Sequence, residues 1–259
     1  MNNPVVNHKI YGENNEKSLY ILHGIFGMLD NWHLAAQQLS AHYRVVTFDA
    51  RNHGKSFHDP NNSFQAMAED LNHLMHYLGD GNKKNTVMGH SMGGKTAMVF
   101  AQIFPERIDK LIVVDIAPKE YVPGHLGYFR AFKEVPIETL SSRKEIEEAF
   151  EPYAPEASVR QFLLKNIEPL PQGGYRTKSN LSAIEHWYST IIGGLNFHHP
   201  FLGETHFIAG EKSGYIKEED KPYILKFFPN TEFHRVEKAG HWVHAENPQG
   251  FLNCLSNFL

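Results

Sequence analysis

The sequence predicts an α/β protein with a mostly parallel sheet, helices on both faces and an inserted helical cap. Short apolar segments alternate with helical ones over residues 19–114, as expected for parallel strands that are covered on both faces. The strand signal disappears between residues 117 and 200 and then resumes. We therefore expect residues 1–118 and 201–259 to form the core and residues 119–200 to form the cap.

The first part of the core contains the expected buried strands, each of them a short apolar run. The strands are expected at residues 19–22, 44–48, 86–88 and 111–114, and amphipathic helices between them at 30–39, 63–78 and 92–102. Ser63 is a candidate N-cap, and residues 5–11 with the turn at 12–15 indicate an edge hairpin. Strands that alternate with helices imply right-handed crossovers, so sites should lie beyond the carboxyl ends of the strands.

The rest of the chain contains the expected cap helices and the last strands. Helical patterns at 143–150 and 159–166 are interrupted by many prolines, strands are expected at 205–209 and 232–236, and a closing helix at 248–258. A helical insertion of this kind would shelter a substrate pocket.

Composition restricts the kind of partner. The net charge of -4 and the pI of about 6.5 provide no basic surface for nucleic acid or an anionic membrane, so we expect a small-molecule partner. The single cysteine, Cys254, cannot form an internal disulfide, and residues 1–4 show no signal-peptide pattern, so a cytoplasmic location is expected. No apolar run is long enough to span a bilayer, so no transmembrane helix is expected.

The central motif is GHSMGG at residues 89–94, which joins an expected strand to an expected helix. The pattern G-x-S-x-G in this context is typical of a nucleophile elbow, a turn so tight that only glycine fits beside the serine. Ser91 would project from the sheet as a nucleophile, and the Met92 amide would point toward an oxyanion. The alternative is an ordinary serine-capped helix in a glycine-rich turn.

A second glycine loop, HGIFG at residues 23–27, follows the apolar strand at 19–22. Its backbone can approach a ligand, so the Ile25 amide, or alternatively that of Phe26, could complete an oxyanion hole. The alternative for this loop is a plain strand-to-helix turn. The polar loop at 49–56 is interpreted as structural support, because aspartate and arginine there would tie the turn together.

A serine nucleophile needs a histidine to take its proton and an acid to orient that histidine. His241 is the candidate base, because it follows the last expected strand and completes the chain order Ser, Asp, His. His244 is the nearest alternative, while His90 is expected to line the pocket or to pack beneath it.

The acid has two candidates. The stretch GEKSG at residues 210–214 follows the penultimate strand and contains no aspartate, so Asp115 is our first choice. Asp115 ends the strand that follows the elbow helix and could reach a histidine beside Ser91. Glu211 remains the alternative acid, and Asp115 could instead only cap the turn at 117–118.

These motifs in this order resemble the α/β-hydrolase superfamily. The residues that carry the resemblance are 23–27, 49–56, 89–94 and the stretch GHWVHAENP at 240–248. More narrowly, MGGK at 92–95, VDIAP at 114–118 and QFLLKN at 161–166 resemble the small bacterial YbfF-type esterases, and this resemblance covers nearly the whole chain, including the cap.

The resemblance implies hydrolysis of carboxylic esters and acyl thioesters without a cofactor, with Ser91 as nucleophile, His241 as base and Asp115 as acid. The sequence departs from the wider superfamily at Ser213, where an aspartate is usual. That departure is shared with the narrower group, so it favours Asp115 and leaves Glu211 open.

Aromatic residues offer apolar surface for a short to medium acyl chain, although such residues more often belong to a core. The candidate substrate-binding residues are Phe26, His90, Trp187 and Trp242, with Phe129 and Phe132 of the cap. Two other functions stay open: carbon–carbon bond hydrolysis or perhydrolysis by the same residues, and ligand binding without catalysis.

No metal site is expected. The pairs His198-His199 and His241 with His244 do not form the H-E-x-x-H pattern, and no cysteine cluster accompanies them. The oligomeric state is not readable, because apolar residues of the closing helix such as Leu252 and Leu255 could serve a core or an interface equally.

Overall fold

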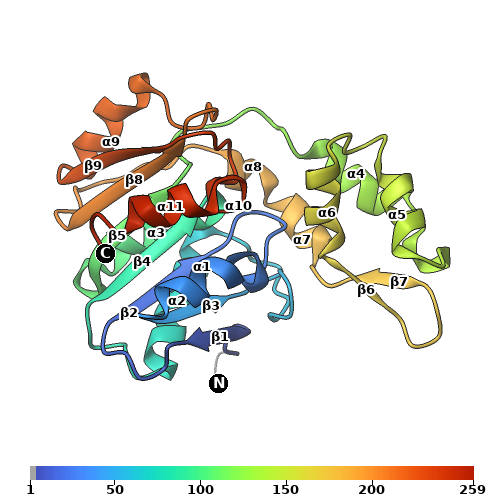
Figure 1. Ribbon diagram of the computed structural model, residues 1–259, viewed down its shortest axis with the longest axis horizontal. Helices are drawn as coiled ribbons and strands as arrows, with labels where there is room; N and C mark the ends of the chain where they lie inside the picture. Colours follow the sequence, from blue (N-terminus) through green and yellow to red (C-terminus); the bar gives the residue numbers. More distant parts are fainter. Residues whose placement is uncertain (1–3) are drawn as a thin grey trace.

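The computed structural model describes residues 4–259, and within them a seven-stranded sheet forms the centre of the molecule (Figure 1). The strand order is β1-β3-β2-β4-β5-β8-β9, and only β1 runs antiparallel to its neighbour. The strands are β1 (His8–Tyr11), β2 (Ser18–Leu22), β3 (Arg44–Phe48), β4 (Asn85–His90), β5 (Ile108–Val114), β8 (Glu204–Gly210) and β9 (Thr231–Val236). The predicted mostly parallel sheet is confirmed.

Helices cover both faces of this sheet, because side chains alternate between the faces along each strand. In β2, Tyr20 and Leu22 pack into one core cluster, whereas Leu19 and Ile21 pack into another on the opposite face. The first face is covered by α2 (Phe64–Tyr77), α3 (Met92–Ile103) and α9 (Lys221–Phe227), and the second by α1 (His33–Leu39) and α11 (Pro248–Leu255). A short helix, α10 (Val243–Glu246), precedes α11.

The prediction of an edge hairpin is wrong in its pairing. β1 is an edge strand, but it pairs with β3 and not with β2, the next strand in the chain. β2 is buried at all five positions because it lies between β3 and β4, so no side remains for β1. The predicted cap at Ser63 is confirmed, since its side chain accepts a hydrogen bond from the Ala66 amide at 3.2 Å.

The loop at residues 49–56 supports the turn as predicted. Asp49 accepts hydrogen bonds from the backbone amides of Leu29 and Lys55, both at 2.8 Å. Gly54 has a φ of +54°, and a Cβ there would lie 2.3 Å from the Asp49 carboxylate, so glycine is required. Arg51 contributes differently from the expectation, because its guanidinium forms a bidentate pair with Asp70 on α2.

The segment between β5 and β8 is mainly helical and lies to one side of the sheet (Figure 1, green to orange). Its elements are α4 (Leu126–Glu134), α5 (Arg143–Phe150), α6 (Ala157–Leu164), β6 (Ile167–Pro169), β7 (Tyr175–Thr177), α7 (Leu181–His186) and α8 (Tyr188–Ile192). The expectation that no strand occurs here is wrong, because β6 and β7 pair as a short hairpin. The segment has its own apolar cluster, which also contains Ile25 and Phe26 of the core.

Lys95 on α3 joins the two ends of this inserted segment. Its side chain is buried, and Nζ donates hydrogen bonds to the carbonyl oxygens of Lys119 (3.0 Å), Ile191 (3.2 Å) and Gly193 (2.5 Å). Burial lowers the pKa of Lys95 to about 7. One buried amine therefore holds the chain where it leaves the core and where it returns.

Replacing Lys95 by methionine is expected to lower the free energy of unfolding by at least about 3 kcal/mol, because three carbonyl groups would lose their donor. The midpoint of urea denaturation measures this change. Lys133→Met is the matched control, since Lys133 forms only an exposed ion pair with Glu185 and should change stability by less than about 1 kcal/mol. Equal midpoints for the two variants would contradict the assigned role of Lys95.

Candidate active site

Ser91 occupies a strained turn between β4 and α3. Its φ of +53° and ψ of -118° lie outside the regions that serine normally adopts. The flanking glycines make this turn possible: a Cβ on Gly89 would lie 2.1 Å from the Gly93 carbonyl oxygen, and one on Gly93 would lie 2.6 Å from that of His23. The local geometry is that of the predicted nucleophile elbow.

The structure brings His241 and Asp115 together across 126 residues of sequence. The ring Nδ1 of His241, in the loop after β9, lies 2.8 Å from Asp115 Oδ2. Asp115 directly follows β5 with a φ of +50° and is completely buried. Its carboxylate also accepts hydrogen bonds from the Gly210 amide (3.0 Å) and the Ser213 hydroxyl (2.5 Å).

Burial influences the charge of both members of this pair. It raises the pKa of Asp115 and lowers that of His241, since both charged forms lose hydration. For Asp115 the donors Ser213 and Gly210 counteract burial, so the carboxylate is held as an acceptor for three donors. His241 then keeps its proton on Nδ1, which leaves Nε2 free to accept another.

Two further residues hold His241, one at its ring and one at its backbone, and sequence reasoning did not assign them this role. The Tyr215 ring stacks on the imidazole with a centroid distance of 3.8 Å and an interplanar angle of 15°. His90 Nε2 donates to the backbone carbonyl of His241 at 2.8 Å. The one sequence feature near Tyr215 was the unusual serine at position 213, and it gave no reason to expect that Tyr215 contacts His241.

Glu211, the alternative acid, lies elsewhere. It is exposed, and its carboxylate accepts a hydrogen bond from the backbone amide of Lys238 at 2.8 Å. Within the described residues 4–259, no hydrogen bond joins Glu211 to His241. The same range holds no hydrogen bond between Ser91 and His241, although both line one cavity; catalytic contacts of this kind often tighten only when substrate binds.

The HGIFG loop forms a tight turn next to Ser91. The Gly27 amide donates to the Gly24 carbonyl oxygen (2.9 Å), and Phe26 has a φ of +59°. The Ala50 amide donates to Nε2 of His23, so the ring proton lies on Nδ1 and binds the Gly24 carbonyl oxygen at 2.8 Å. Burial lowers the pKa of His23 to about 4, which keeps this ring neutral.

The amides of Ile25, Phe26 and Met92 have no hydrogen-bond acceptor in the part of the chain that the structure describes. All three residues are buried, so these donors are shielded from bulk water, and Phe26 stays the alternative to Ile25 as the second donor. The turn that carries Ile25 is held from the inserted segment, because Asn166 Nδ2 donates to the Phe26 carbonyl oxygen at 2.7 Å.

A cavity of about 530 Å³ lies between the core and the inserted segment, within the size range of small-molecule sites. Its core lining includes Ser91, His241, Ile25, Phe26, His90 and Trp242, and the inserted segment adds His125, Tyr128 and Phe162. Three of the predicted substrate-binding residues therefore line the cavity. The sequence analysis did not predict the cavity residues of the inserted segment, because the spacing of apolar residues in a helix cannot show which of its faces meets the core.

The expectation that Trp187 binds substrate is corrected, because Trp187 does not line this cavity. Its indole N–H donates to the backbone carbonyl of Pro60 at 2.8 Å, so the ring joins the inserted segment to a core loop. Phe129 and Phe132 also lie outside the lining, in the apolar cluster around Phe26, with ring centroids 4.9 Å and 6.1 Å from that of Phe26. Both are core residues, which was the stated alternative to a role in substrate binding.

Among residues 4–259, no helix combines the length and apolar character needed to cross a membrane. The expectation that residues 1–4 lack a signal-peptide pattern falls largely on residues 1–3, which lie outside the described residues.

Comparison with known proteins adds independent information. A family model described as alpha/beta hydrolase fold matches residues 17–248. The sn-1-specific diacylglycerol lipase ABHD11 of Danio rerio is 37% identical over 257 residues, which cover 96% of this chain and 80% of the relative. Esterase YbfF of Escherichia coli (strain K12) is 34% identical over 253 residues, or 95% and 94% of the two chains. Among solved structures, a marine microorganism esterase matches with a TM-score of 0.95 and 37% identity, covering 99% of this chain and all of the other.

Proposed function

The chain belongs to the α/β-hydrolase family, as a carboxylesterase acting on ester bonds, and we propose that it cleaves its substrates through Ser91, His241 and Asp115 by way of an acyl-enzyme. One observation carries this proposal: His241 Nδ1 lies 2.8 Å from the buried carboxylate of Asp115, and His241 lines the same cavity as Ser91. The exposed position of Glu211 supports Asp115 as the acid.

In the first step, His241 Nε2 takes the proton from Ser91 Oγ as that oxygen attacks the substrate carbonyl carbon. The carbonyl π electrons move onto its oxygen, and the amides of Ile25 and Met92 donate hydrogen bonds to that oxyanion. Loss of one such donor would cost about 3 to 4 kcal/mol of transition-state stabilisation. Asp115 stabilises the imidazolium that forms, without taking its proton.

The oxyanion then collapses, the bond to the leaving group breaks, and His241 delivers its proton to the departing alcohol or thiol. The acyl group remains on Ser91. Water attacks this acyl-enzyme with His241 again as base, and the carboxylic acid leaves as Ser91 regains its proton. His241 accepts or donates the proton in every step of this reaction.

We also propose that residues 119–200 act as a cap that shelters the site. Tyr128 and Phe162 from this segment line the cavity that contains Ser91, and Asn166 holds the oxyanion turn through the Phe26 carbonyl. Lys95 holds both ends of the segment, which supports a cap that stays attached to the core during turnover.

An activated serine can be tested directly by intact-mass spectrometry after exposure to a fluorophosphonate. We expect one adduct per chain in the wild type, none in Ser91→Ala and a strongly slowed reaction in His241→Ala. Ser256→Ala is the matched control, because Ser256 is exposed on the closing helix and should not affect labelling. An unlabelled wild type that is correctly folded would refute the proposed mechanism.

The cavity supports substrates with short to medium acyl chains, as esters or as acyl-CoA thioesters. A series of p-nitrophenyl esters and acyl-CoAs from acetyl to palmitoyl would measure kcat/KM against chain length, and we expect the maximum below the long chains. Trp242→Ala should shift this preference, because Trp242 lines the cavity, whereas Trp187→Ala should not. A maximum at palmitoyl, or the same shift in both variants, would contradict this substrate class.

A further inference from the structure

Two neighbouring strands at the edge of the sheet carry the same Glu-x-His pattern. Glu204 and His206 lie on β8, and Glu232 and His234 lie on β9. Residues two apart in a strand point to the same face, and the register pairs His206 with Glu232. The four side chains therefore lie on one face of the sheet.

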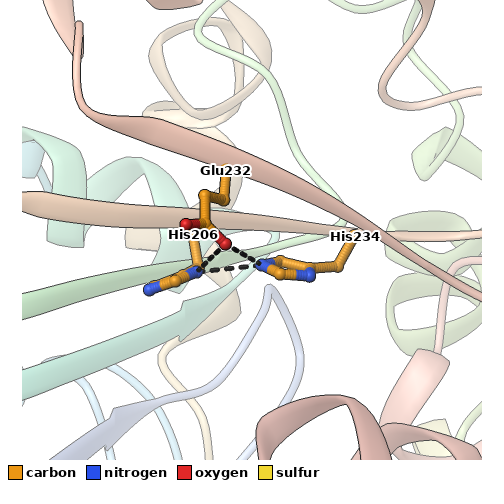
Figure 2. Close-up of side chains that lie close together, drawn as sticks. All are labelled: His206, Glu232 and His234. Atoms are coloured by element: carbon orange, nitrogen blue, oxygen red, sulfur yellow. Dashed lines mark hydrogen bonds and ion pairs between the residues drawn. The ribbon is translucent and has the colours of Figure 1, made fainter. Parts of the chain in front are cut away.

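Three of these side chains converge on one point, as Figure 2 shows. His206 Nδ1 lies 2.9 Å from His234 Nε2 and 4.0 Å from Glu232 Oε2, and His234 Nε2 lies 3.9 Å from the same oxygen. A point equidistant from these three atoms lies about 2.1 Å from each, which is the length of zinc–nitrogen and zinc–oxygen bonds.

The fourth side chain orients His206 for this role. Glu204 Oε1 lies 2.8 Å from His206 Nε2, the ring nitrogen that faces away from the cluster. An ionised carboxylate can only accept, so the His206 proton lies on Nε2 and the Nδ1 lone pair points toward His234 and Glu232. Metal-binding histidines typically have such a carboxylate on their second nitrogen.

The surroundings hold the histidines in place but leave the cluster open on one side. His206 is buried and stacks on the Phe258 ring, with centroids 3.8 Å apart and planes at 7°. His234 also stacks on Phe258, with ring centroids 4.8 Å apart, and the centroids of the two imidazoles are separated by 5.1 Å. Glu232 has a side chain that is 73% exposed, so an ion and a water ligand can reach it from solvent.

We propose that His206, His234 and Glu232 bind a zinc ion, with water as the fourth ligand. Two imidazoles and one carboxylate are a donor set that zinc accepts. His234 Nε2 now donates its proton to His206 Nδ1, so on binding His234 must move that proton to its other nitrogen. Zinc replaces this hydrogen bond, and no change in the net charge of either ring is needed.

This site is separate from the esterase site and has a structural role. Gly210, whose amide binds Asp115, lies four residues further along β8, which is about 13 Å of strand. β9 is the edge strand of the sheet, so an ion held between β8 and β9 would fasten that edge. The inference does not depend on the proposed catalytic mechanism.

Calorimetric titration of chelator-treated full-length protein with zinc chloride tests this site. We expect one ion per chain and a higher Tm in the presence of zinc. Glu232→Gln and His234→Gln should abolish this binding, and Glu204→Gln should weaken it about 10- to 100-fold because it loses the orienting carboxylate. The Glu232 side chain is exposed, so Glu232→Gln should fold normally.

The double variant His198→Gln/His199→Gln is the matched control, because these adjacent, exposed histidines could bind zinc without the proposed cluster. We expect the control to bind zinc with wild-type affinity. Absence of binding to the wild type, unchanged binding in Glu232→Gln and His234→Gln, or loss of binding in the control would each overturn the assignment. Ester hydrolysis by the Glu232 variant should stay at the wild-type rate, which separates this result from any failure of the catalytic proposal.

Discussion

Ser91→Ala is expected to lower kcat for a p-nitrophenyl ester by about 10⁵- to 10⁶-fold, the scale on which removal of a serine nucleophile acts. The reason is the elbow: Ser91 is held at a φ of +53° beside the Met92 amide, and alanine would keep this turn while removing the attacking oxygen. Initial rates at saturating substrate measure the effect, and a circular dichroism spectrum identical to that of the wild type shows that the fold persists.

Ser256→Ala serves as the control for this measurement, since the Ser256 side chain binds only the Asn253 carbonyl oxygen on the closing helix. It should retain wild-type kcat. A Ser91→Ala enzyme with more than about one hundredth of wild-type kcat would rule out a serine acyl-enzyme, because the residual rate from oxyanion binding alone is far lower.

Asp115→Asn is expected to lower kcat by about 10⁴-fold with little change in stability of the site's backbone. The asparagine amide would donate to His241 Nδ1, so the ring proton would move to Nε2 and the base could no longer accept from Ser91. The 2.8 Å contact between Nδ1 and Oδ2 makes this substitution nearly isosteric. Comparison of kcat at the pH optimum of the wild type measures the loss.

Two variants calibrate that result. Glu211→Gln should leave kcat within about twofold of the wild type, because Glu211 binds the Lys238 amide and not His241. Ser213→Ala should reduce kcat by about tenfold, since it removes one donor to the Asp115 carboxylate but keeps the tautomer of His241. A large loss in Glu211→Gln together with an active Asp115→Asn would instead make Glu211 the acid.

Local patterns were sufficient for most elements of the core. The strands β2, β3 and β5 were visible as short apolar runs. The helix capped by Ser63 was visible from the spacing of its apolar residues and from one side-chain hydrogen bond at its start. Neither needs a distant partner. The short hairpin of β6 and β7 was missed because its strands have three residues each and one contains Pro169, too little for an alternating pattern to appear.

Pairings between distant segments could not be predicted in this way. The Glu-x-His pattern occurs twice in the sequence, but only the adjacency of β8 and β9 makes it a cluster. Likewise, Trp187 has the aromatic character expected of a pocket residue, yet its hydrogen bond to the Pro60 carbonyl directs it away from the cavity.

The sequence by itself predicted the fold class and the candidate roles of Ser91 and His241. The glycine-flanked serine between strand and helix is a local, steric requirement, and His241 was found by its place after the last strand in the chain order Ser, Asp, His. Our proposal of Asp115 over Glu211 as the acid rests on the tertiary structure alone. Both residues follow neighbouring parallel strands, β5 and β8, so their positions along the chain are equivalent. What separates them is the burial of Asp115 and the convergence of Gly210, Ser213 and His241 on its carboxylate, contacts that form only when segments about one hundred residues apart pack together.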